Sequence, residues 1–237
     1  MARRAPRPAR KNPAAPHAAK AKPRSASSPR VAPAPRRTAP PEPRTLRLGA
    51  VPGATPGRWI ATWKARMPHV AIELVEVPFA AQRERIADDD LDLAIVREPF
   101  DRDGMHAIPL YEELPVVITS VDSHLLAADE LDPADLEGET LLTTAEDVLD
   151  LTLPTTPATF GMLDTVSDAV ATVASGVGIV VVPLSLARLH HRKDVEHRPL
   201  RGGPVSPVLL AWRAERTTED VETFIGIVRG RTANSSR

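Results

Sequence analysis

The sequence contains no cysteine among its 237 residues, which excludes disulfide bonds, thiolate metal ligands and cysteine nucleophiles. Only 3% of the residues are aromatic, so a core must be built mainly from aliphatic side chains. No apolar run reaches the roughly 18 residues that a membrane helix needs. Since a chain without cysteine suits a reducing compartment, we expect a cytoplasmic protein that makes no membrane contact.

The sequence patterns of several enzyme classes are also missing. There is no HExxH, GxSxG or GxGxxG pattern and no phosphate-binding P-loop. His190 and His191 favour a polar surface over a metal site, and the acidic run 88–90 favours a solvated turn. We therefore expect no catalytic residue, metal or cofactor, with an enzyme kept as an alternative because one fold can serve several functions.

Charge is distributed very unevenly along the chain. Residues 1–45 hold 12 Lys and Arg residues, 11 of the 25 prolines and one acid, Glu42, whereas the remainder holds 18 basic and 30 acidic residues. With almost no large apolar side chains, the segment 1–45 is expected to be disordered. Two interpretations remain open: a weak, sequence-independent contact with DNA phosphates, or a solubilising leader or linker.

The body of the chain alternates between strand and helix patterns, which predicts an α/β fold of two lobes with a parallel sheet. A ligand is then expected in a crevice at the carboxyl ends of the strands. Strands are predicted at 45–51, 71–77, 91–96, 139–144, 179–183 and 207–213, with two more within 105–120. Helices are predicted to begin at the capping residues Thr55, Asp132, Ser167 and Thr217, and a further short helix is predicted within 79–90. Asp135 stands at the position that completes a capping box with Asp132.

The segment "VASGVGIVVVP" (173–183) indicates a helix that ends at Gly176 and reverses at Gly178 into a buried strand. It resembles a signature of the effector-binding domain of LysR-type transcriptional regulators. Four further segments resemble that family in the same order along the chain, so that the resemblance covers about 46–230. They are "LRLGAVPGATP" (46–56), "IADDDLDLAIVRE" (86–98), "DSHLLA" (122–127) and "DPADLEGETLL" (132–142).

This resemblance implies the type 2 periplasmic-binding-protein-like fold, in which two crossover strands join two lobes. Lobe one would comprise 46–119 plus 209–230 and lobe two 120–208, followed by a C-terminal tail, 231–237. The crossover strands would be "VVITS" (116–120) and "VLLAW" (208–212).

No winged helix-turn-helix can be drawn through the proline-rich first 45 residues, so we expect a stand-alone effector-binding module. The module would sense a small polar or carboxylated metabolite in a regulatory role. The resemblance also implies a homodimer. The alternative is a DNA-associated regulator that uses the basic segment for non-specific contact.

Ligands in such a fold are held by helix N-termini, hydroxyl groups and backbone N–H groups from both lobes. Arg97 follows a buried strand and could pair with a ligand carboxylate, or else with Glu98 or an acid of 88–90. The hydroxyl candidates could equally be structural. The expected ligand-binding residues are Gly53, Ala54, Thr55, Arg97, Thr119, Ser120, Thr143, Thr144, Thr165 and Ser167.

Overall fold

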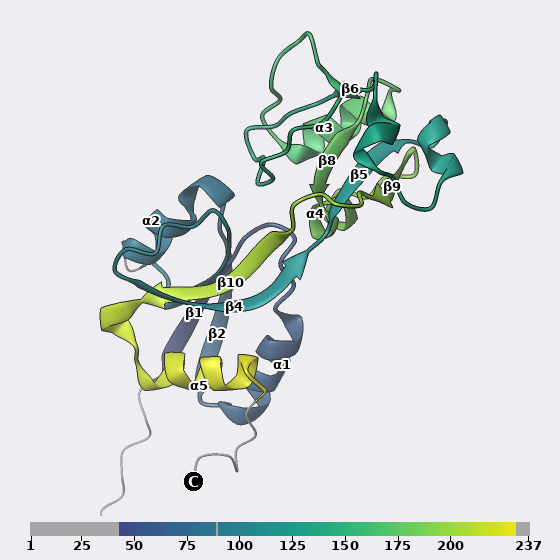
Figure 1. Ribbon diagram of the computed structural model, residues 1–237. Helices are drawn as coiled ribbons and strands as arrows, with labels where there is room; N and C mark the ends of the chain where they lie inside the picture. Colours follow the sequence, from purple (N-terminus) through teal and green to yellow (C-terminus); the bar gives the residue numbers. More distant parts are fainter. Residues whose placement is uncertain (1–42, 89, 231–237) are drawn as a thin grey trace, which may run out of the picture. The chain divides into compact units, whose positions relative to one another are not determined.

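The computed structural model describes residues 43–88 and 90–230, and they form two main β-sheets with flanking helices (Figure 1). The expectations for 1–42 and 231–237 lie outside the described residues. The first strand begins at Arg44, so the last two residues of the segment 1–45 belong to the body. No helix within the described ranges is long and apolar enough to cross a membrane.

The first sheet has the strand order β2-β1-β3-β10-β4. Strand β1 pairs in parallel with β2 and β3, as the alternation of strands and helices predicts, while β10 is antiparallel to β3 and β4. Its strands are β1 (Arg44–Ala50), β2 (Val70–Glu76), β3 (Leu93–Arg97), β4 (Met105–Glu113) and β10 (Ser206–Arg213). Its helices are α1 (Gly57–Arg66), η1 (Phe79–Ala81), α2 (Gln82–Ala87), η4 (Ala214–Arg216) and α5 (Glu219–Val228).

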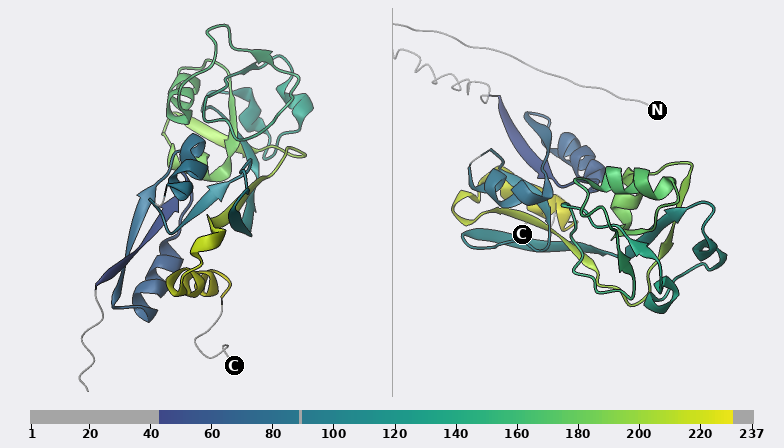
Figure 2. Two further views of the ribbon diagram at one scale, coloured as in Figure 1. Left: turned by 90° about the vertical axis from the view of Figure 1, so that its left-hand side faces the viewer. Right: turned by 90° about the horizontal axis from the view of Figure 1, so that it is seen from above.

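Both faces of this sheet are covered because the side chains of its central strand alternate between two cores. Leu93 and Ile95 of β3 join the core that contains α1 and α5, and Ala94 and Val96 join the core on the α2 side. Helices α1 and α5 lie side by side, with the rings of Trp63 and Phe224 5.9 Å apart (Figure 2).

The second sheet is antiparallel with the order β8-β5-β9. Val116 and Ile118 of β5 face the core formed with α3 and α4, and Val117 faces the opposite core. The short helix α4 and strand β9 have no counterpart among the elements predicted from the sequence. The elements of this part are β5 (Pro115–Ser120), η2 (His124–Ala127), η3 (Pro133–Leu136), β6 (Thr140–Leu141), β7 (Thr156–Pro157), α3 (Val166–Ala174), β8 (Val180–Pro183), α4 (Leu184–Leu189) and β9 (Val195–Pro199).

The chain passes between the sheets twice, at residue 114 and within 200–205. The two passages are adjacent, as the hydrogen bond from the Leu200 N–H to the Pro115 carbonyl at 3.0 Å shows. We refer to the parts around the first and second sheets as lobe 1 and lobe 2. The expected boundary at 119/120 is wrong in detail. Strand β5 pairs only with β8 and β9 among the described strands, so 115–119 belong to lobe 2 and the crossing lies before β5.

Three helix starts differ from the capping pattern expected from the sequence. Helix α1 begins without a side-chain cap, so Thr55 does not cap it. Helix α3 is capped by Thr165, which accepts from the Asp168 N–H, and Ser167 lies in its first turn. Helix α5 is capped by Thr218 rather than Thr217, whose hydroxyl accepts instead from the indole of the nearby Trp212. For α3 and α5, two hydroxyl residues stand within two positions of each other, and the sequence does not determine which of them caps the helix.

The turn between α3 and β8 confirms the expectation for its two glycines. Gly176 and Gly178 both have positive φ, 83° and 70°. A Cβ on Gly178 would lie 2.1 Å from the Thr140 carbonyl oxygen, so a side chain cannot be accommodated there without displacing the backbone. The predicted capping box at 132–135 is also present, at the start of η3.

Candidate functional site

A cleft of about 220 Å³ lies at the carboxyl ends of the parallel strands of lobe 1. Pro52 follows β1, Glu76 ends β2 and Arg97 ends β3, and all three line the cleft together with Phe79 of η1. The sequence-based expectation of a crevice at this edge is therefore met, since parallel strands bring their carboxyl ends to one side of the sheet.

Lobe 2 supplies the opposite wall. Its lining residues come from the segment after β6, from the start of α3 and from α4, and they are Glu146, Val148, Thr165, Ser167, Leu186, Leu189 and His190. The cleft thus combines apolar side chains with carboxylates, hydroxyl groups and one imidazole. Such a mixture suits a small molecule with an apolar body and a few polar groups.

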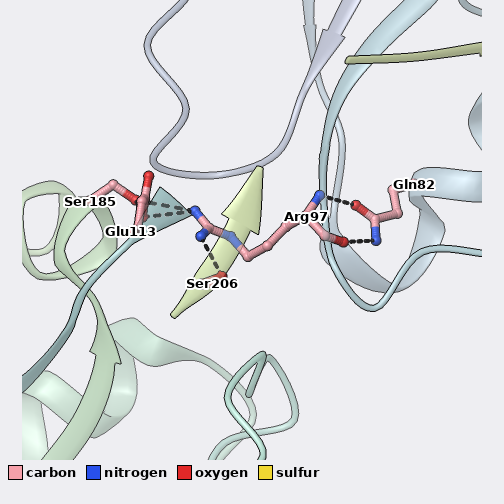
Figure 3. A network of polar contacts seen from close by, with 5 residues as sticks. All are labelled: Gln82, Arg97, Glu113, Ser185 and Ser206. Carbon is pink, nitrogen blue, oxygen red and sulfur yellow. Dashed lines mark hydrogen bonds and ion pairs between the residues drawn. The ribbon is translucent and has the colours of Figure 1, made fainter. Parts of the chain in front are cut away.

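Arg97 is the most deeply buried polar group of the cleft, with only 2% of its side chain exposed. Its Nη2 atom donates to Glu113 Oε2 at 3.1 Å and to Ser185 Oγ at 3.2 Å, and its Nη1 atom donates to Ser206 Oγ at 2.8 Å (Figure 3). The Ser185 hydroxyl in turn donates to Glu113 Oε2 at 2.6 Å. The guanidinium is therefore held by β4, β10 and α4, and its charge is balanced by Glu113.

The backbone of Arg97 is fixed as firmly as its side chain. The buried amide of Gln82 donates to the Arg97 carbonyl at 2.8 Å and accepts from the Arg97 N–H at 2.9 Å (Figure 3). Helix α4 is tied to the same region, because the Leu184 N–H donates to the Leu114 carbonyl at 3.1 Å. The network therefore joins lobe 1 to the start of α4 beside the first passage between the sheets.

The N-terminus of α3 reaches the cleft, and two of its first N–H groups have side-chain partners. The Val166 N–H donates to Glu146 Oε2 at 2.9 Å, and the Asp168 N–H donates to the capping Thr165 hydroxyl at 3.1 Å. A carboxylate at this position is stabilised by the positive end of the helix dipole. Glu146 thus occupies the place where an anionic ligand would be expected.

Two residues beside the cleft have shifted pKa values. Partial burial and the negative charge of Glu113 raise the pKa of Tyr111, and the opposing effect of Arg97 is smaller. Burial raises the pKa of Asp147, next to Glu146, and the hydrogen bond from the Leu149 N–H partly counteracts it. Each shift disfavours the ionised form of its own side chain.

The expected ligand residues of the first loop do not line the cleft. Gly53 forms a turn with φ of 83°, and a Cβ there would lie 2.4 Å from Ser185 Oγ, so this glycine allows the loop to pack against α4. Ala54 packs against the core of lobe 1, and Thr55 is exposed. The neighbouring Pro52 takes the lining position instead.

The hydroxyl candidates divide into three groups. Thr119 and Ser120 lie at the end of β5 that leads away from the passage between the sheets, and they do not line the cleft. Thr143 and Thr144 line a smaller neighbouring pocket that shares Glu146 with the cleft. Thr165 and Ser167 line the cleft itself, on the wall that lobe 2 supplies.

Residues that sequence reasoning did not identify provide much of the site. Glu113, Ser185 and Ser206 bind Arg97 from positions 16, 88 and 109 residues away, whereas the expected partner Glu98 pairs with Arg102. A buried arginine signals that a carboxylate must be near. With 31 acidic residues in the chain, that signal could not select Glu113.

His190 lines the cleft rather than lying only on a polar surface. Within residues 43–88 and 90–230, no group of three or more His, Cys, Asp or Glu side chains is arranged to hold a metal ion. The side chains of Ser167 and Glu76 make no hydrogen bond or ion pair within this part of the chain. They are available to a ligand.

The two sheets, the two passages between them and the cleft define a two-lobed type 2 periplasmic-binding-protein-like fold. The model of the LysR substrate binding domain matches residues 41–233. The chain belongs to this family, as the resemblance of its segments indicates.

Two curated regulators are similar in sequence. The Hca operon transcriptional activator HcaR of Escherichia coli (strain K12) is 26% identical over 207 residues, which are 81% of this chain and 70% of the activator. The HTH-type transcriptional regulator CatR of Pseudomonas putida is 32% identical over 171 residues, 65% of this chain and 57% of CatR. Each match covers well over half of this chain.

Solved structures share the fold at lower sequence identity. The BenM effector binding domain with its effector benzoate has a TM-score of 0.64 and 20% identity, covering 81% of this chain and 96% of that one. The reduced form of the OxyR regulatory domain from Pseudomonas aeruginosa has a TM-score of 0.62 and 23% identity, covering 79% and 98%. These similarities establish the fold.

Proposed function

We propose that this chain binds a small-molecule effector in the cleft between lobe 1 and lobe 2 and serves in transcription regulation. The observation that carries the proposal is the cleft itself, which is lined from both lobes at the carboxyl ends of β1, β2 and β3. Its volume of about 220 Å³ suits a molecule smaller than a typical drug. The benzoate-binding BenM domain, which shares the fold, supports a ligand of that size.

Effector binding would act by population shift. A ligand that contacts both lobes binds more tightly to one arrangement of the lobes than to others, and so favours that arrangement. Because the chain belongs to a family of transcription regulators, we expect the cleft to bind its ligand without converting it. A cytoplasmic location, where transcription is regulated, is part of the same proposal. The homodimer remains a prediction, which sedimentation equilibrium of the full chain would test.

The experiment is a thermal-shift screen of the full chain with amino acids, amines, carboxylic acids and aromatic metabolites, followed by calorimetry. A compound at 100 times its Kd adds about 2.7 kcal/mol of stability, and so raises the Tm by about 5–10 °C. Turnover of a bound compound, abolished by Arg97→Ala, would contradict the non-catalytic role.

Two matched variants on α3 locate the binding site. Ser167→Trp places a large side chain in the cleft and is expected to abolish the Tm increase. Ala171→Trp places the same side chain at an exposed position of the same helix and should preserve it. The proposal is wrong if no compound raises the Tm, or if binding is equally strong in both variants.

A further inference from the structure

We propose that the effector carries a positively charged nitrogen, such as a primary amine, on a small apolar body, and that carboxylates are poor ligands. This inference rests on the proposed function and names the ligand class of the same cleft. It follows from the charged side chains that line the cleft and are not paired with another charged side chain of the protein.

The cation best placed to bind a carboxylate is already neutralised. Arg97 contacts Glu113 at 3.1 Å, with 2% and 9% of the two side chains exposed, and it also binds two serine hydroxyls (Figure 3). A ligand carboxylate would compete with Glu113 for the same guanidinium and lie close to that negative charge. It would add a negative charge to the cleft without a further cation to balance it.

The second feature that could bind an anion is occupied in the same way. The carboxylate of Glu146 accepts the Val166 N–H at 2.9 Å at the start of α3, and the cap Thr165 satisfies the Asp168 N–H at 3.1 Å. A ligand carboxylate at this helix end would compete with Glu146 and be repelled by it. The protein thus provides its own anion at each of the two anion-binding features.

The charges left unbalanced in the cleft are negative. Among the lining residues, the ionisable groups are Glu76, Glu146, Arg97 and His190, and Arg97 is balanced by Glu113. Two carboxylates therefore face a cavity of about 220 Å³. Glu146 is half-buried and Glu76 is exposed, and both attract a cation and repel an anion.

The remaining surface of the cleft fits the other end of such a ligand. It is largely apolar, and the side chains that make it so are Phe79, Val148, Leu186 and Leu189. The unbonded hydroxyl of Ser167 can accept a further hydrogen bond from an ammonium group. A small ring or short chain with an amine would use both kinds of surface.

The test compares matched probes on the full chain by calorimetry at pH 7. Benzylamine, benzyl alcohol and benzoate share one ring and differ in charge, and cyclohexylamine and cyclohexanecarboxylate form a second set. We expect each amine to bind at least tenfold more tightly than the carboxylate of its set. Glu76→Gln and Glu146→Gln should each weaken amine binding about tenfold, and Gln retains an acceptor for the Val166 N–H.

The control is Glu73→Gln, which removes a carboxylate from the same strand as Glu76 but outside the cleft, where it pairs with Arg47. It should leave amine affinity unchanged. Carboxylate or alcohol binding as tight as amine binding, lost in Ser167→Trp, would overturn the charge inference while supporting an effector site. Equal loss in Glu73→Gln and Glu76→Gln would also overturn it. No binding by either probe set or by the wider screen would overturn the proposed function as well.

Discussion

At the scale of single residues, the buried pair of Arg97 and Glu113 organises the junction of the lobes. Residues far apart in sequence supply its partners, and the hydroxyls of Ser185 and Ser206 accept two further hydrogen bonds from the guanidinium. Buried ion pairs add little stability relative to apolar packing, but removing one partner leaves an uncompensated charge. The pair therefore constrains which arrangement of strands is allowed more than it adds to stability.

Glu113→Gln should lower the free energy of unfolding by about 3 kcal/mol, because Arg97 would remain buried without a counter-charge. Arg97→Met should lower the free energy of unfolding by a similar amount, because Glu113 would then remain buried without a counter-charge. The double variant should lose less than the sum of the two, which urea unfolding measures as a coupling energy. Arg192→Gln, in an exposed pair with Asp194, is the control and should change the unfolding midpoint little. Strict additivity would show that the pair is not coupled.

Tyr111 offers a direct optical probe of the same pair, since it is the only tyrosine in the chain. Burial and the charge of Glu113 raise its pKa, so its phenolate absorbance at 295 nm should appear above pH 10. Because the pKa is raised in the folded state, the stability linked to it is lost as the pH rises above the ordinary value.

Glu113→Gln should move this titration to lower pH, because it removes the charge that opposes phenolate formation. Titration of the urea-unfolded chain, where the midpoint should be near the ordinary value of about 10, is the control. An unchanged midpoint in the folded variant would show that Glu113 does not act on this tyrosine.

At the scale of elements, the turn between α3 and β8 shows two different reasons for glycine. Gly176 and Gly178 both have positive φ, but within 4 Å of a Cβ built at Gly176 there is open space, whereas one at Gly178 would meet the backbone of Thr140. The first position needs only the left-handed conformation. The second also needs the absence of a side chain, because β6 passes directly beside it.

Gly176→Ala should therefore cost about 1 kcal/mol, the penalty for an alanine in the left-handed region. Gly178→Ala should cost at least about 1–3 kcal/mol more, because a backbone atom blocks the new methyl group. Urea unfolding of both variants measures the difference. Equal losses would mean that the chain around Thr140 adjusts without cost.

At the scale of the whole molecule, the charges of the sequence are divided between a basic first segment and an acidic body. If the first segment contacts DNA phosphates, a fluorescent random-sequence duplex should bind the full chain at 50 mM salt. The affinity should fall about a hundredfold or more by 200 mM, because bound counterions are released. A chain lacking residues 1–42 should not bind. Equal binding of the two chains would rule out this role for the segment.

The sequence by itself determined the features that depend on near neighbours. The alternation in 71–77 predicted a strand, the order of elements predicted parallel pairing of β1, β2 and β3, and the spacing of Asp132 and Asp135 predicted their capping box. These patterns are readable because each is enforced by local geometry, either the two-residue period of a strand or the first turn of a helix. Together with the family resemblance, they fixed the fold and the edge of the sheet at which the cleft lies.

Only the tertiary structure decided which groups meet in that cleft. Arg97 could be singled out in sequence, but its pairing with Glu113 depends on β4 and β3 both adjoining β10, and its contact with Ser185 depends on α4 returning from lobe 2. Likewise, Glu146 reaches the start of α3 from 20 residues away. Side-chain charges carry no record of their partners along the chain, because a long-range contact is set by the packing of whole elements.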